Sequence, residues 1–133
     1  MNLLATLRRR TVLVAVVPTV LLVWPGTGSA HALLDKAEPA RRAVLSKPPA
    51  AIRLWFNEQL EPAFSSLIVV DGTGRPVTRT PAQVSRADPK LLALELPLLA
   101  PGEYTVRYQV LSVDGHTVKS SYTFKIKAAA GPR

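Results

Sequence analysis

Three residues in this sequence of 133 are of types and spacing that could bind one metal ion together: His31, Asp114 and His116. The chain has only 2 histidines, and the second of them ends the segment Asp114-Gly115-His116. In an extended segment, residues two apart project on the same side, so a carboxylate and an imidazole can reach one ion. Asp-Gly is also a common hairpin turn, and in that interpretation the histidine beside it is incidental.

His31 follows a segment that is typical of a secretory signal peptide. Within residues 1–30, basic residues come first, an apolar run follows, and small residues end the segment. Gly28 and Ala30 fit the two small-residue positions of a signal peptidase site, so we expect cleavage between Ala30 and His31. Pro18 interrupts the apolar run, which is shorter than the roughly 20 apolar residues of a membrane-spanning helix. We therefore expect an exported chain that begins at His31.

A free N-terminus would give His31 two donors, because the α-amine and the imidazole of one residue can close a chelate ring on a metal. Together with Asp114 and His116, the set then comprises three nitrogens and one oxygen. A planar arrangement of such ligands suits copper(II), which heads the stability order of divalent ions, whereas zinc favours a tetrahedral site. The chain has 0 cysteines, and its 1 methionine is Met1. The sequence therefore predicts one copper(II) ion per chain and excludes sites built on sulfur.

Several segments predict the strands that must position these residues. Apolar and polar residues alternate with a period of two, or form one continuous apolar run at 67–70, which is typical of strands in a small all-β protein. The segments are 52–56, 67–70, 92–96, 104–110 and 118–127. Prolines and Asp-Gly turns fall mainly between them, and no comparable helical periodicity follows residue 31. We expect an antiparallel β-sandwich or barrel, of the Ig-like or Greek-key kind.

The mature chain is long enough for one domain, which we place at 31–127, followed by a flexible C-terminal tail at 128–133. The whole chain has a formal net charge of +8, part of which belongs to the arginines of the expected leader. The remaining basic residues are scattered along the chain, and this pattern does not favour binding to nucleic acid. No segment after the leader is apolar enough for stable insertion in a membrane.

Several motifs together resemble the CopC-type copper-resistance proteins over nearly the whole mature sequence. They are His31-Ala32-Leu33-Leu34, Glu38-Pro39-Ala40, Leu54-Trp55-Phe56-Asn57-Glu58, Leu99-Ala100-Pro101-Gly102-Glu103-Tyr104-Thr105-Val106, Ser112-Val113-Asp114-Gly115-His116 and Tyr122-Thr123-Phe124. Members of this family are exported Greek-key β domains of about seven strands that bind copper ions. By this resemblance, the copper(II) ligands fall on the amine and imidazole of His31, on Asp114 and on His116. Glu58 matches a carboxylate near the metal in some relatives, although a surface charge at a strand end needs no functional explanation.

The sequence departs from the family pattern at three places, none of which removes a ligand. Asn57 replaces the usual serine before Glu58, Thr117 stands where proline commonly follows the histidine, and Lys119-Ser120 replaces a stretch of small residues. Relatives with a second site, for copper(I), use a methionine-rich segment that this sequence lacks. The resemblance therefore implies a member that binds copper(II) alone.

The resemblance favours a copper(II)-binding protein of the periplasm or extracellular space that is not an enzyme. Such a monomer would sequester copper or deliver it to a CopD-like transporter in the inner membrane. A copper monooxygenase is one alternative, because a histidine brace also begins with an N-terminal histidine, but Asp114 would fill a position that oxygen activation needs open. A metal-free Ig-like interaction domain is the other alternative, and in it both histidines are incidental.

Overall fold

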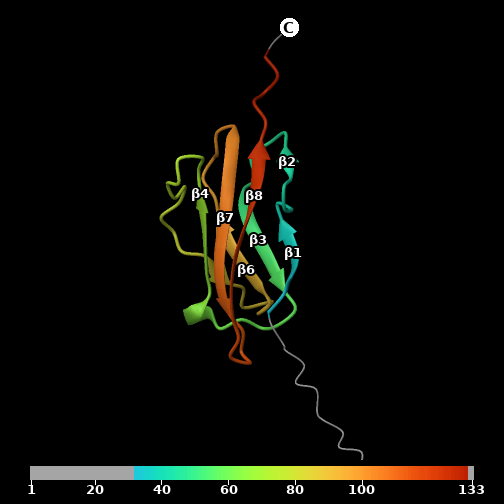
Figure 1. Ribbon diagram of the computed structural model, residues 1–133, viewed down its shortest axis with the longest axis vertical. Helices are drawn as coiled ribbons and strands as arrows, with labels where there is room; N and C mark the ends of the chain where they lie inside the picture. The colour runs from blue at the N-terminus through green and yellow to red at the C-terminus, as the bar shows by residue number, and fades with distance from the viewer. Residues whose placement is uncertain (1–31, 132–133) are drawn as a thin grey trace, which may run out of the picture.

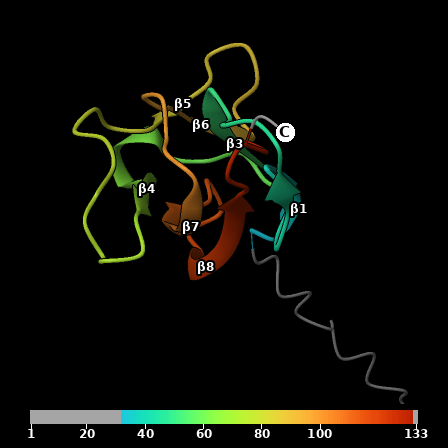
Figure 2. The ribbon, with the colours of Figure 1, turned by 90° about the horizontal axis from the view of Figure 1, so that it is seen from above.

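Two four-stranded β-sheets pack face to face in the computed structural model, which describes residues 32–131 (Figures 1 and 2). The first sheet has the order β1 (Leu34–Glu38), β3 (Ala51–Phe56), β6 (Leu91–Glu95) and β5 (Gln83–Val84). The second has the order β2 (Val44–Leu45), β8 (Thr117–Ile126), β7 (Gly102–Leu111) and β4 (Ser66–Val70). A single 3₁₀ turn in the described chain, η1 (Pro62–Phe64), precedes β4.

The antiparallel hairpin of β7 and β8 is the backbone of the second sheet. Its pairing runs without interruption from Gly102 opposite Ile126 to Leu111 opposite Thr117. β4 pairs antiparallel with β7, and β2 pairs parallel with β8. All pairings of the first sheet are antiparallel. The β7–β8 turn, η1 and the first described residues all lie at the lower end of the molecule in Figure 1.

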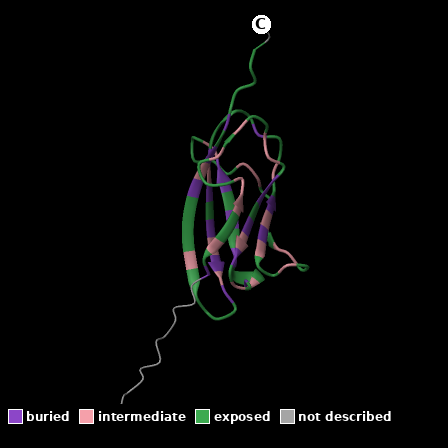
Figure 3. Cartoon of the chain, turned by 90° about the vertical axis from the view of Figure 1, so that its right-hand side faces the viewer, coloured by how far each residue is buried: buried purple, intermediate pink, exposed green. Residues whose placement is uncertain are grey.

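The core lies between the sheets because each long strand turns alternate residues inward. Leu54, Val106 and Phe124 are completely buried, and buried and exposed residues alternate along the strands (Figure 3). Phe56 meets Tyr108 of the opposite sheet edge-on, with ring centroids 5.6 Å apart. Each fully buried aliphatic or aromatic side chain contributes roughly 1.5–3 kcal/mol, so the sandwich needs no disulfide to hold its two layers together.

The structure confirms the prediction of an all-β fold. Of the two predicted architectures, it is a sandwich of two sheets and not a barrel. All five strand segments predicted from alternation are present as β3, β4, β6, β7 and β8. The described residues contain eight strands, close to the number of about seven that the family resemblance implies. β1, β2 and β5 are the three that the alternation did not predict. The predicted leader, its cleavage site and His31 lie outside the described residues. Between residues 32 and 131, no helix is long and apolar enough to cross a membrane.

Candidate metal centre

Asp114 and His116 lie in the β7–β8 turn (residues 112–116). This segment is a hairpin turn, so the extended backbone assumed for the Asp-x-His spacing is not what brings the two residues together. Gly115 adopts φ +94°, a conformation that glycine reaches without strain. The turn is closed by hydrogen bonds from the Ser112 amide to the His116 carbonyl, 3.0 Å, and from the Gly115 amide to the Ser112 carbonyl, 2.9 Å.

The side chain of Ser112 holds the turn together through hydrogen bonds to Asp114 and His116. It is completely buried, and its Oγ donates a hydrogen bond to Oδ1 of Asp114. The same Oγ accepts from the His116 amide at 3.3 Å. The bond from Ser112 is the largest cause that lowers the pKa of Asp114, followed by hydrogen bonds from His116. Asp114 is therefore an ionised carboxylate at neutral pH, as a metal ligand must be.

The side chains of Asp114 and His116 converge at the protein surface. Nδ1 of His116 lies 3.1 Å from Oδ1 of Asp114, and the two side chains are 45% and 32% exposed. The imidazole and the carboxylate are therefore adjacent and both open to solvent. Because both side chains are exposed, an ion from solvent could reach them without a rearrangement of the surrounding protein.

Replacing Ser112 with alanine tests this arrangement. We expect the pKa of Asp114 to rise toward its ordinary value, because the hydrogen bond that lowers it most is lost. We also expect stability to fall by about 1 kcal/mol, since the His116 amide loses an acceptor. An NMR titration of the Asp114 carboxyl and chemical unfolding measure the two effects. Ser121→Ala, at an exposed position of β8, is the matched control, and an unchanged Asp114 pKa in Ser112→Ala would contradict the assignment.

A short segment after β3 connects the start of the described chain with the β7–β8 turn. The Leu33 amide donates to Oδ1 of Asn57 at 2.7 Å, and the Asn57 amide donates to the Leu33 carbonyl at 3.1 Å. Two residues further on, the Gln59 carbonyl accepts from the Val113 amide at 2.9 Å. The segment 57–59 therefore contacts both the residue two positions after His31 and the turn that carries Asp114.

Glu58 lies within this connecting segment and is half-buried. Among residues 32–131, no group of three or more histidine, cysteine, aspartate or glutamate residues is placed to hold a metal ion. The structure thus brings together Asp114 and His116 but does not join Glu58 to them in such a group. The role predicted for Glu58 stays a prediction.

The sequence does not predict a role in the site for Ser112 or Asn57. Ser112 belongs to the motif only as a neighbour of Asp114, and Asn57 is a departure from the family pattern. The available signal for Ser112 was a small hydroxyl residue two positions after the alternating segment 104–110. Asn57 gave no local signal, because its partner Leu33 is 24 residues away.

The fold and the turn define a class: small β-sandwich domains with a carboxylate and an imidazole exposed at one end. The chain belongs to the CopC family, since residues 34–127 match the CopC domain. It is 39% identical over 110 residues to YobA of Escherichia coli (strain K12), a match that covers 82% of this chain and 88% of YobA. The crystal structure of CopC from Methylosinus trichosporium OB3b superimposes with a TM-score of 0.71 at 34% identity, covering 77% of this chain and 100% of that one.

A third relative is a much longer protein. The copper transport protein CutJ of Bacillus subtilis (strain 168) is 28% identical over 112 residues, which make up 84% of this chain but 21% of CutJ. A domain like this one therefore forms a minor part of a chain named for copper transport. These comparisons confirm the family resemblance and the sandwich fold.

Proposed function

We propose that this protein is exported and binds one copper(II) ion between its N-terminal residue, His31, and the β7–β8 turn. The observation that carries the proposal is the exposed contact between His116 and Asp114 in a member of the CopC family. The ion is cargo that the protein sequesters or passes on, in the periplasm or outside the cell. Nothing in this arrangement calls for a reaction at the ion, since Asp114 would take a position that a reacting molecule needs.

The distance between the two donors supports binding to a single ion. Metal bonds of about 2.0–2.2 Å to nitrogen and oxygen, at a right angle, separate the donor atoms by roughly 2.8–3.1 Å. The 3.1 Å between His116 Nδ1 and Oδ1 of Asp114 is the length of a hydrogen bond from the imidazole to the carboxylate, and it falls at this separation. Once the imidazole gives up this proton, rotation of the two side chains would let both atoms bind one tetragonal ion.

The position of Leu33 supports a contribution from His31. Leu33, two positions after His31 in the sequence, is hydrogen-bonded to Asn57, in the segment that also contacts the β7–β8 turn. The amine and imidazole of His31 supply the two nitrogens that the turn lacks. Signal-peptide cleavage would then create the complete site, because the amine is free only in the processed chain.

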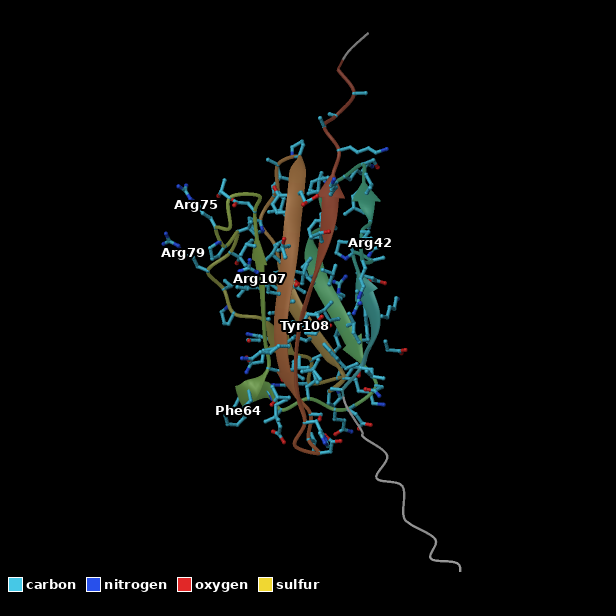
Figure 4. All side chains as sticks on the ribbon, viewed as in Figure 1. Arg42, Phe64, Arg75, Arg79, Arg107 and Tyr108 are labelled. Carbon is cyan, nitrogen blue, oxygen red and sulfur yellow. The ribbon has the colours of Figure 1, made fainter. Side chains whose placement is uncertain are left out.

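Transfer to a membrane copper transporter is the second half of the proposal. Three large apolar side chains are exposed at the end of the sandwich that carries the turn: Leu33 (63%), Phe64 (65%) and Val113 (59%). Phe64 projects outward from η1 at the lower end in Figure 4. The match with part of the copper transport protein CutJ supports a CopD-like transporter as the partner that docks there. An apolar surface around the cargo would bring the acceptor's ligands close to the ion.

Competition titration of the processed protein against a copper(II) chelator at several pH values tests the function. We expect binding of one ion per chain and an affinity that falls between about pH 8 and 5, because free imidazoles and α-amines take up protons in this range. The lowered pKa of Asp114 keeps its carboxylate ionised over most of that range, so the nitrogen donors govern the loss. Absence of tight one-to-one binding would refute the function, and a flat pH profile would refute the ligand set.

A further inference from the structure

A side chain continues the β1–β3 ladder at the point where the strands end. The last regular pair is Leu34 opposite Phe56. At the next position, the amide of Asn57 donates to the carbonyl of Leu33, and the amide of Leu33 donates in return to Oδ1 of Asn57. An asparagine side chain thus supplies the acceptor that a strand carbonyl would otherwise provide.

These bonds restrain the described chain where it leads toward His31. Leu33 has both backbone groups paired with one residue, and Ala32 is completely buried. The side chain of Leu33 is 63% exposed, so side-chain burial contributes little to holding this residue. The hydrogen bonds to Asn57 are therefore a principal restraint on the backbone at residue 33.

The other end of the same segment, at Gln59, is hydrogen-bonded to the β7–β8 turn. The Gln59 carbonyl accepts from the Val113 amide at 2.9 Å, and Leu60 forms a β-bridge with Ser112. Only one residue separates Asn57 from Gln59. The segment 57–59 thus fixes the spacing between the start of the domain and the residues that carry Asp114.

We propose that Asn57 is a positioning residue of the copper site, and this inference rests on the proposed function. Its Oδ1 holds Leu33 so that the donors of His31 and those of the β7–β8 turn reach the same ion. Asn57 does not itself bind the metal. Without this bond, the buried Ala32 and the bond from the Asn57 amide still hold the chain, but the Leu33 amide loses its acceptor, and ordering about one residue when copper binds would cost up to roughly tenfold in affinity.

Asn57→Leu and Asn57→Asp separate this role from a general effect on folding. Leucine has a similar size but no acceptor, whereas aspartate keeps an oxygen that can accept from the Leu33 amide. We expect about tenfold weaker copper(II) binding and an altered copper EPR spectrum in Asn57→Leu, with the spectrum restored in Asn57→Asp. Gln59→Leu is the matched control, because Gln59 is also exposed and makes its contact through its backbone.

Hydrogen exchange of the Leu33 amide in the metal-free processed protein gives a second readout. We expect protection of this amide in the unaltered protein and in Asn57→Asp, and its loss in Asn57→Leu. An unprotected Leu33 amide in the unaltered protein would overturn the inference even if Asn57→Leu folded poorly. Copper bound by Asn57→Leu with unaltered affinity and spectrum would overturn it while leaving the proposed function standing. Failure of the unaltered protein to bind copper would overturn both.

Discussion

Replacing His116 with alanine is expected to lower the affinity for copper(II) by at least about 100-fold. Loss of a residue that merely orients a ligand typically costs 10–100-fold, and His116 is proposed as a ligand itself. Asp114 would then be left without the imidazole that lies 3.1 Å from it. Competition titration of the processed variant measures the loss, and its copper EPR spectrum should show one nitrogen donor fewer.

The fold should survive this substitution. His116 is exposed, and a change at an exposed position usually alters stability by less than about 0.5 kcal/mol. Thr117→Ala is the matched control, because Thr117 is the next residue in the chain and is also exposed. Equal copper affinities for His116→Ala and Thr117→Ala would mean that the β7–β8 turn is not part of the site.

The long strands were predictable because each has one buried face. β3, β7 and β8 alternate buried and exposed residues over much of their length, and this alternation is visible in the sequence. β2 and β5 have two residues each, too few to show a period. β2 forms because Val44 and Leu45 pair with Lys125 and Ile126, which lie near the other end of the domain in the sequence. In β1, an irregularity between Leu34 and Lys36 interrupts the alternation.

The contact between Asp114 and His116 could be predicted from the sequence, but the way the chain forms it could not. The Asp-x-His spacing pointed correctly to two adjacent side chains, yet the hairpin turn and the buried hydroxyl of Ser112 bring them together. The connection between Leu33 and Asn57 depends on how β1 pairs with β3. Such a long-range register leaves no mark in the local sequence, so a positioning role for Asn57 emerged only from the structure.

The N-terminal amine of His31 is the central element of the proposed site, and blocking it should have an effect as large as the loss of His116. Acetylation removes the basic amine and its charge but leaves every side chain in place. The chelate ring then cannot form, and one of the three nitrogen donors is lost. We expect the affinity for copper(II) to fall by at least about 100-fold, since the amine binds within the same residue as the imidazole.

The most direct measurement compares two forms of the chain that begin at His31, one with a free amine and one acetylated, in the same competition titration. Thermal unfolding of both metal-free forms serves as the control and should give equal midpoints. We expect tight one-to-one binding of copper(II) by the free form and a loss of affinity of at least about 100-fold in the acetylated form. Equal affinities of the two forms would contradict a site that begins at His31.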